Sequence, residues 1–296
     1  MVAIALTFFS ARGPVCAQPP EDEQVPDPAT DLPAYIEHYS RPFRIDREEF
    51  KFTQKYYWHR LFHPTLSDKV WGAGVLIASF TLATQKNRIQ ADVAEDDSPS
   101  RERFFRRAQD LGGRGIVPAI AALFYLGGSA FHDYRAKETG FMLAESGILT
   151  GILTVTGMWV LSEDRPREGG RLHPFKGIGH GVSGHAATAA SISGVLSRMY
   201  FHVEPDDGRV ARTFKWIGKG FVYGAPVAVS FGRVNEQQHF VYSTILGMAI
   251  GFWTSNAVAD AHGLYLQAPR SRLKPSGVAP IVGDRGRAGA VVRWEF

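Results

Sequence analysis

The chain has 296 residues, of which 45% are hydrophobic and 21% charged, and its formal net charge at pH 7 is +4. This is an ordinary globular composition that can bury one sizeable core, and a mean hydropathy of −0.13 does not require a membrane protein. The small positive charge is spread along the chain. It fits an anionic substrate or surface and gives no reason to predict nucleic-acid binding.

The first 17 residues have the pattern of a secretory signal peptide. An apolar run over residues 2–9 is followed by the small-residue sequence Val15-Cys16-Ala17, which is typical of a cleavage site. No Lys or Arg precedes the apolar run, and a disordered apolar tail is the alternative. Cleavage after Ala17 would remove Cys16, the single cysteine of the chain. Disulfides, thiol catalysis and cysteine-bound metals would then be excluded.

Residues 18–66 are predicted to form a linker and an N-terminal extension. The segment 18–33 is rich in Pro, Asp and Glu, which is typical of a solvated linker. Residues 34–66 mix aromatic and charged side chains. We expect an irregular or short-helical layer there, lying over the main domain.

Six mostly uncharged stretches follow, and they define a main domain over residues 67–265. Their lengths and their content of Ala, Leu, Ile and Gly favour helices over strands, so the predicted fold is an all-α bundle of about six core helices. Only the last stretch reaches the roughly 20 residues that span a bilayer easily. The stretches cover residues 70–85, 115–131, 146–162, 186–197, 220–232 and 240–259.

The segments outside these stretches are expected to be peripheral. The link 86–114 is highly charged and predicts a solvated helix face. The tail 266–296 contains two β-prone runs, 278–282 and 290–296, on either side of the turn Gly283-Asp284-Arg285-Gly286. This pattern predicts a small C-terminal β-hairpin.

Three polar clusters lie at the ends of apolar stretches. They are Arg165-Pro166, Ser183-Gly184-His185, and Arg233 followed six residues later by His239. Helix N-termini attract anions through free N–H groups, and an arginine fork matches phosphate oxygens. Two histidines can supply a nucleophile and an acid, which phosphoryl transfer through an enzyme intermediate requires. The clusters therefore predict a phosphate site at helix ends.

These clusters resemble the three-part signature of the type 2 phosphatidic acid phosphatase and haloperoxidase superfamily. That signature reads Lys-x6-Arg-Pro, then Pro-Ser-Gly-His, then Ser-Arg-x5-His-x3-Asp. The matching residues agree in order, spacing and placement, and the resemblance covers roughly residues 70–262. They are Arg165, Pro166, Ser183, Gly184, His185, Arg233 and His239.

The resemblance implies a role for each matching residue. His239 would attack phosphorus and form a covalent phosphohistidine, and His185 would protonate the leaving oxygen. The equatorial oxygens of the transition state would be held by two guanidinium groups and by backbone N–H groups. The residues that supply these groups are Arg165, Arg233, Ser183 and Gly184.

Four positions depart from the signature. Met158 replaces the Lys, Val182 the Pro, Gly232 the Ser, and Ser243 the Asp that orients the nucleophile in the family. Ser243 lies one helical turn after His239, so we expect its hydroxyl to reach the ring, unless a carboxylate from elsewhere takes this place. A hydroxyl can hold a tautomer but stabilises an imidazolium less, which predicts slower chemistry. Three cations could replace the missing Lys: Arg167, Arg171 and Lys176.

Other ionisable residues are given simpler interpretations. His180 could touch substrate, but an ordinary loop histidine is the expectation. Glu145 is expected to be a helix-end charge near water rather than a buried partner of an arginine. No histidine pair has metal-ligand spacing with a nearby carboxylate, so neither a metal nor another cofactor is expected.

The location of the protein follows from a parity argument. By resemblance, membrane members of the family have six spanning helices and an outward-facing site, which places the start of the first helix in the cytoplasm. A cleaved signal peptide would place that start outside, so the signal, six spans and an external site are incompatible. We expect a domain on the periplasmic side of the cell envelope, soluble or peripheral rather than integral.

The predicted function is a phosphatase that acts on a phosphomonoester or diphosphate, with a phosphorylated lipid as the expected substrate. Two alternatives remain open. A non-catalytic anion- or lipid-binding relic would account for Met158 and Ser243. A vanadium-dependent haloperoxidase, in which His239 would bind vanadate, shares the fold by resemblance, although the chain is short for that group.

Overall fold

The structure is a computed structural model that describes residues 47–94, 99–113, 115–203, 207–267, 277–282 and 288–293. The predicted signal peptide at 1–17, Cys16 within it and the predicted linker at 18–33 lie outside the described residues. Within the described part, the chain is an all-α bundle followed by a small antiparallel hairpin, as the sequence predicts.

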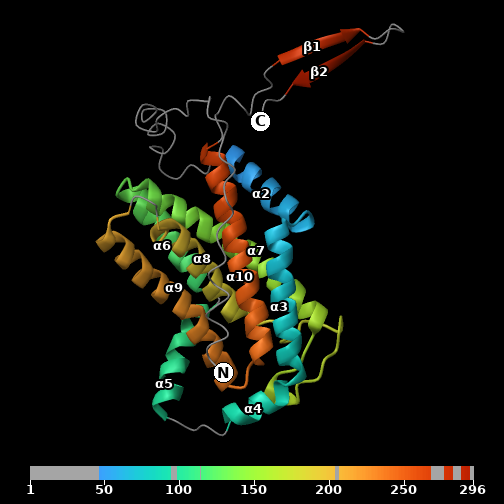
Figure 1. Ribbon diagram of the computed structural model, residues 1–296, viewed down its shortest axis with the longest axis vertical. Helices are drawn as coiled ribbons and strands as arrows, with labels where there is room; N and C mark the ends of the chain where they lie inside the picture. Colours follow the sequence, from blue (N-terminus) through green and yellow to red (C-terminus); the bar gives the residue numbers. More distant parts are fainter. Residues whose placement is uncertain are drawn as a thin grey trace.

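All six apolar stretches are helices, and three of the helices, α7, α9 and α10, extend well beyond the apolar residues. Figure 1 shows α10 running along the middle of the bundle, with α3 and α9 on opposite sides of it, and α8 packs against α10 more extensively than any other pair of elements. The six helices are α3 (Leu66–Thr84), α6 (Ile116–Ala130), α7 (Tyr134–Leu161), α8 (Gly184–Tyr200), α9 (Arg209–Asn235) and α10 (Val241–Gln267).

Shorter elements surround this bundle. The expected N-terminal layer contains a regular helix, α2 (Arg47–Phe62), which packs on α10. The charged link forms α4 (Lys86–Ala94), α5 (Pro99–Ala108) and the 3₁₀ turn η2 (Gln109–Gly112), and a second 3₁₀ turn, η3 (Pro166–Glu168), follows α7. The hairpin pairs β1 (Gly277–Val282) with β2 (Ala288–Arg293).

Side-chain caps fix the starts of the helices that surround the site. The Asp133 carboxylate accepts a hydrogen bond from the N–H of Ala136 at the start of α7, and the Ser183 hydroxyl accepts one from Ala186 at the start of α8. Helix α7 ends at Leu161, and the next residue, Ser162, adopts a left-handed conformation with φ 39°. The chain therefore turns sharply after α7 and enters the loop that carries Arg165.

Glycines bring α8 and α10 together at backbone distance. A Cβ on Gly251 would overlap the carbonyl of Ala187, and one on Gly247 would overlap that of Ser183. The N–H of Ser183 also donates a 2.9 Å hydrogen bond to the carbonyl of Ser243. Because of these contacts, the start of α8 and the start of α10 lie side by side.

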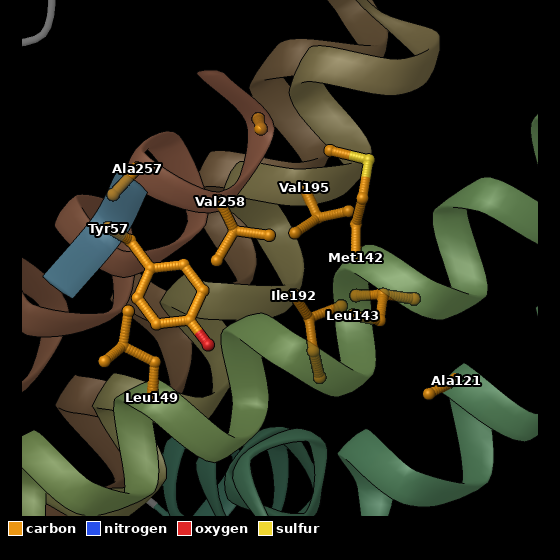
Figure 2. Packing of buried hydrophobic residues seen from close by; sticks show 10 residues of the cluster. Tyr57, Ala121, Met142, Leu143, Leu149, Ile192, Val195, Ala257 and Val258 are labelled. Atoms are coloured by element: carbon orange, nitrogen blue, oxygen red, sulfur yellow. The ribbon is translucent and has the colours of Figure 1, made fainter. Parts of the chain in front are cut away.

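The hydrophobic core lies between α7, α8, α10 and α2. Figure 2 shows the Tyr57 ring of α2 beside Leu149, with Val195 of α8 and Val258 of α10 pointing into the same interior, which also contains Leu143. Burying a Val or Leu side chain stabilises a fold by about 1.5–3 kcal/mol. At the end of the bundle where α8 and α10 begin, the helices are instead held together by the hydrogen bond and the close glycine contacts described above.

A buried ionic cluster lies at the C-terminal end of α10. The His262 ring contacts the Glu138 carboxylate through Nδ1 and the Glu145 carboxylate through Nε2, the latter at 2.8 Å. Thr53 of α2 donates to the second Glu145 oxygen at 2.8 Å. Glu145 is therefore buried and paired with a histidine, which corrects the expectation of a helix-end charge near water.

Many large apolar side chains on the outer faces of the bundle are exposed. Phe80 on α3 and Phe221 on α9 are 73% and 78% exposed. Among the described helices, α7 is long and apolar enough to cross a membrane, and the bent pair Arg103–Gly112 and Ile116–Ala130 is a second candidate. The stretch in α10, which was the one expected to be long enough, is not such a candidate.

Candidate functional site

The three polar clusters of the sequence meet at one end of the bundle. Arg165 lies in the loop after α7, His185 in the first turn of α8, Arg233 in the last turn of α9 and His239 just before α10. The charges of Arg233, His180 and His185 all act on the His239 ring, and the charge of Arg165 acts on Arg233. The predicted site residues are thus neighbours in space.

His239 is held in one tautomer by a backbone group. Its side chain is buried, with 3% of the residue exposed, and its Nδ1 lies 3.0 Å from the carbonyl oxygen of His180. A carbonyl oxygen can only accept, so Nδ1 must carry the proton and donate. The lone pair of the neutral ring is then on Nε2, which is the nitrogen a nucleophile needs.

The surroundings of His239 favour the neutral ring. Burial is the largest cause, and together with the charge of Arg233 it lowers the pKa of His239 to about 3, against the opposing effect of the His180 carbonyl. An unprotonated imidazole is therefore present across the whole physiological pH range. This is the form that can attack an electrophile.

His180 belongs to the site, although its sequence context suggested an ordinary loop histidine. Its ring packs edge-on against the His239 ring, with 5.8 Å between ring centroids. The backbone N–H of His180 donates to the Glu163 carbonyl at 2.6 Å. Burial and the charge of Arg165 lower the pKa of His180. The contact that orients His239 is made by the backbone carbonyl of His180. A backbone contact of this kind cannot be predicted from residue types in the sequence.

Two arginines place donors beside the histidines. Arg165 pairs with Glu168 at 3.4 Å, and Arg233 donates from Nη1 to the Gln109 side-chain oxygen at 3.0 Å. The Nε atoms of both arginines are buried and have no hydrogen-bond partner in the described part of the chain. Buried donors without acceptors are costly, and a phosphate oxygen would satisfy them.

The charged link reaches the site and is more than a solvated surface helix. Gln109 of η2 accepts from Arg233 and donates to Glu236 at 2.5 Å, so it fixes the guanidinium from the side. A Cβ on Gly232 would lie 2.7 Å from the carbonyl oxygen of Phe105. The glycine that replaces the signature Ser therefore lets α5 and η2 approach α9, which the sequence pattern did not reveal.

Ser183 is placed at the site but its polar groups are already used. Its hydroxyl caps α8 by accepting from Ala186, and its N–H donates to Ser243. The expectation that the Ser183 N–H binds substrate is thus not supported by its contacts. Gly184 follows it in the first turn of α8, where N–H groups lack intrahelical acceptors and can face an anion.

Ser243 does not take the place of the missing carboxylate. It is fully buried, and its hydroxyl donates to the carbonyl of Phe240 at 2.9 Å. The partner of His239 Nδ1 is the carbonyl of His180. The expected orienting contact from Ser243, or from a carboxylate elsewhere, is thus made by the backbone, because the loop before α8 passes directly beside the His239 ring.

The other two departures from the signature are accommodated by packing. A Cβ on Gly184 would lie 3.4 Å from the terminal methyl of Met158, so an uncharged side chain lies beside the start of α8. Val182 is buried and packs against α7 at Gly157. Of the three cations considered as substitutes for the missing Lys, Arg167 is the one whose charge acts on His180 and Arg233.

The residues of the site do not form a metal centre. Within the described ranges, no three His, Cys, Asp or Glu side chains are grouped so that they could hold a metal ion. The arrangement instead offers one neutral histidine, a second histidine at a helix start, and two arginines with unsatisfied donors. Such a set can bind a tetrahedral oxyanion and attack its central atom.

Comparisons with known proteins support the fold. No protein-family model matches the chain, and no curated protein matches it. One solved structure is similar: a transmembrane PAP2-type phosphatidylglycerolphosphate phosphatase from Bacillus subtilis, with a TM-score of 0.53 and 17% sequence identity. The similarity covers 69% of this chain and 98% of that chain. At this identity, the likeness establishes a shared helical architecture.

Proposed function

We propose that the chain is a phosphatase that acts through a covalent phosphohistidine on His239. The observation that carries this proposal is the environment of one ring. His239 is buried and neutral, and its Nδ1 is tied to a carbonyl. Arg233, whose charge acts on the ring, and Arg165, whose charge acts on Arg233, both have unsatisfied Nε donors. A neutral nucleophile among cations is suited to an anionic electrophile.

In the proposed reaction, His239 Nε2 attacks phosphorus as the bond to the leaving oxygen breaks. His185 gives its proton to that oxygen, and the product alcohol or phosphate leaves. His185, now neutral, takes a proton from a water molecule as that water attacks the phosphohistidine; the N–P bond breaks, and inorganic phosphate and free His239 result. Arg165 and Arg233 hold the equatorial oxygens, where negative charge is concentrated in the transition state.

We further propose that the substrate is a phosphorylated lipid and that the protein works at a membrane of the cell envelope. The support is the exposed apolar surface on opposite sides of the bundle, where α3 and α9 carry large side chains such as Phe80 and Phe221 (Figure 1). Extensive exposed apolar area marks membrane or protein contacts. Membrane fractionation tests this part: the protein should sediment with membranes and be released by a carbonate wash, whereas retention after carbonate would show an integral protein and absence from the membrane fraction would contradict the proposal.

Trapping the intermediate tests the reaction. The purified full chain is incubated with ³²P-labelled phosphatidate in detergent micelles and quenched in alkali, where phosphohistidine survives. We expect label on the wild type and none on His239→Ala. His185→Ala should still become labelled from substrates with good leaving groups, because acid catalysis matters less for them.

The result also separates the proposal from a non-catalytic role. A wild-type protein that binds phosphate or phosphatidate but neither turns over nor becomes labelled would be an anion-binding relic. Turnover that persists at the wild-type rate in His239→Ala would show that another residue is the nucleophile. Either result would overturn the proposed reaction.

A further inference from the structure

A cluster outside the three motifs lies against the loop of Arg165. The ammonium group of Lys86, at the start of α4, lies 2.6 Å from Glu163 Oε1 and 2.6 Å from the carbonyl oxygen of Gly170. It also lies 4.7 Å from the centroid of the Phe240 ring. The other Glu163 oxygen accepts a hydrogen bond from the Tyr242 hydroxyl. We refer to these five residues as the Lys86 cluster.

One side of the cluster is continuous with the loop that carries Arg165. Glu163 precedes Arg165 by two residues, and the N–H of Gly170 donates to the Arg165 carbonyl at 3.1 Å. Lys86 therefore contacts the loop on both sides of Arg165. The carbonyl of Glu163 also accepts from His180, whose own carbonyl holds His239.

The other side of the cluster is continuous with the start of α10. Phe240 follows His239 directly, and Tyr242 lies two residues further on. A Cβ on Gly170 would overlap the Phe240 ring, so the Arg165 loop and the residue after His239 are in direct contact. Lys86 lies over the same ring and completes this contact from α4.

The charge of Lys86 is used within the cluster and is not a displaced copy of the signature Lys. Glu163 is 1% exposed, and a buried carboxylate requires a paired cation or several hydrogen bonds. Lys86 and Tyr242 provide them. An ammonium group bound to a carboxylate and a carbonyl is directed into the protein, while the two arginines remain for the substrate.

We propose that Lys86 is a positioning residue of the site, holding the Arg165 loop against the segment that carries His239. This inference rests on the proposed function, since positioning matters only if the two residues act on one substrate. Displacing catalytic groups by about 1 Å can reduce rates by up to about 100-fold. Loss of Lys86 is therefore expected to lower kcat even where the protein stays folded.

The experiment compares four variants of the full chain with the wild type, using phosphatidate in detergent micelles. They are Lys86→Met, Lys86→Arg, the double variant Lys86→Met/Glu163→Gln, and Lys69→Met as a matched control at an exposed lysine of α3. Assays are run well below each melting temperature. Melting temperature, kcat and KM are measured for each variant.

We expect kcat of Lys86→Met to fall about tenfold or more, with a smaller change in KM, since misplacement acts mainly on the transition state. Lys86→Arg should recover to within about threefold of wild type, and Lys69→Met should match it. The double variant removes the unpaired buried carboxylate, so its melting temperature should recover while its kcat stays low. A kcat that recovers together with the melting temperature, or an unaltered kcat in Lys86→Met, would overturn the proposal.

A binding experiment distinguishes failure of this proposal from failure of the proposed function. Orthovanadate, which mimics the transferred phosphoryl group, is titrated calorimetrically into each variant. If the wild type binds orthovanadate but has no phosphatase activity, the proposed function fails, and weaker binding by Lys86→Met but not Lys69→Met still supports positioning. Equal binding by both variants, or no binding by the wild type, would overturn the role of Lys86.

Discussion

Two buried histidines with opposite surroundings lie near the two ends of helix α10. His239 precedes its first turn and His262 lies near its C-terminal end, roughly 30 Å away along the axis. The first ring lies beside a carbonyl and the charge of Arg233, and the second lies between two carboxylates. Figure 1 shows that the two ends of α10 lie at opposite ends of the bundle.

The difference lies in which charges are already satisfied. An imidazolium donates from both nitrogens, so His262 between Glu138 and Glu145 forms a closed set of partners, with Thr53 adding one more donor. The ring and the two carboxylates satisfy one another, so this cluster gives no indication of a ligand site. At the other end, the Nε donors of Arg165 and Arg233 are left without acceptors among the described residues, and the neutral His239 brings no negative charge to pair with either guanidinium.

Burial alone therefore does not distinguish a catalytic histidine from a structural one. The distinguishing feature is the balance of neighbouring charges. Neighbouring carboxylates stabilise a cationic ring and fix the fold, whereas burial beside a cation keeps a ring neutral. This contrast predicts that substitutions at the two ends will affect different quantities.

The largest effect on stability is expected at the His262 end. His262→Gln removes the ring that bridges two buried carboxylates, and leaving a buried carboxylate without its partner typically costs about 3–5 kcal/mol. We expect the free energy of unfolding, measured by denaturant titration, to fall by roughly this amount while kcat of the folded protein is retained. His63→Gln, at an exposed histidine, is the control. A loss of kcat with unchanged stability would contradict the contrast.

A large effect on catalysis is expected at the other end. Arg233→Ala removes a guanidinium that is proposed to bind the transferred phosphoryl group, and loss of one such donor costs on the order of 100-fold in kcat/KM. Stability should fall only by the roughly 0.5–1.5 kcal/mol of the lost Gln109 hydrogen bond, because the buried Nε lacks a partner. Arg212→Ala, on the exposed part of the same helix, should resemble the wild type. Steady-state kinetics and thermal melting distinguish the two outcomes.

An intermediate effect concerns pH. With its pKa lowered to about 3, His239 stays neutral at pH 5, so the rate should show no acid limb near the ordinary histidine pKa of about 6.5. The unfolded chain binds a proton below pH 6.5 that the native protein excludes until about pH 3. Stability is therefore lost as pH falls through this window, by on the order of 3 kcal/mol at pH 4.

Two measurements check this prediction. The pH dependence of kcat/KM is recorded from pH 4 to 8, and denaturant titrations are repeated at the same pH values for the wild type and His239→Ala. The variant should lack the part of the stability loss that is due to this ring. A wild-type acid limb centred near pH 6.5 would contradict the neutral, desolvated ring.

The smallest effect is expected for Ser243→Ala. The hydroxyl bonds to the Phe240 carbonyl and not to the His239 ring, so its loss should lower stability by about 0.5–1.5 kcal/mol and leave kcat within about threefold. Ser243→Asp would bury a carboxylate without a partner and mainly destabilise the fold. A tenfold or larger fall in kcat for Ser243→Ala would restore the orienting role first expected from the sequence.

The helices were predictable because each apolar stretch is longer than a strand and is bounded by capping residues or glycine. Their ends were less so: α7 begins at Tyr134 and α9 at Arg209, each about 11 or 12 residues before its apolar stretch. Polar residues in these first turns give no hydrophobic signal. Tertiary packing, which the local pattern does not contain, extends both helices.

The principal site residues were predictable from spacing because helix ends place them. Arg165, His185, Arg233 and His239 lie together as expected. The contacts that support them were not predictable. Gln109 is brought in by a close approach of α5 at Gly232, and such an approach depends on how the helices pack. The sequence marks the groups that can react more clearly than the groups that hold them.

The hydrogen bond that orients His239 has a consequence for genetics. Its acceptor is a main-chain oxygen, so no substitution of the His180 side chain removes it. Substitutions at the two neighbouring glycines should instead displace this carbonyl. A Cβ on Gly179 would lie 2.5 Å from the backbone nitrogen of Glu163, and one on Gly181 would overlap Leu161. A mutational scan should therefore find loss of activity at Gly179 and Gly181, although neither residue has a side chain that could donate or accept a hydrogen bond.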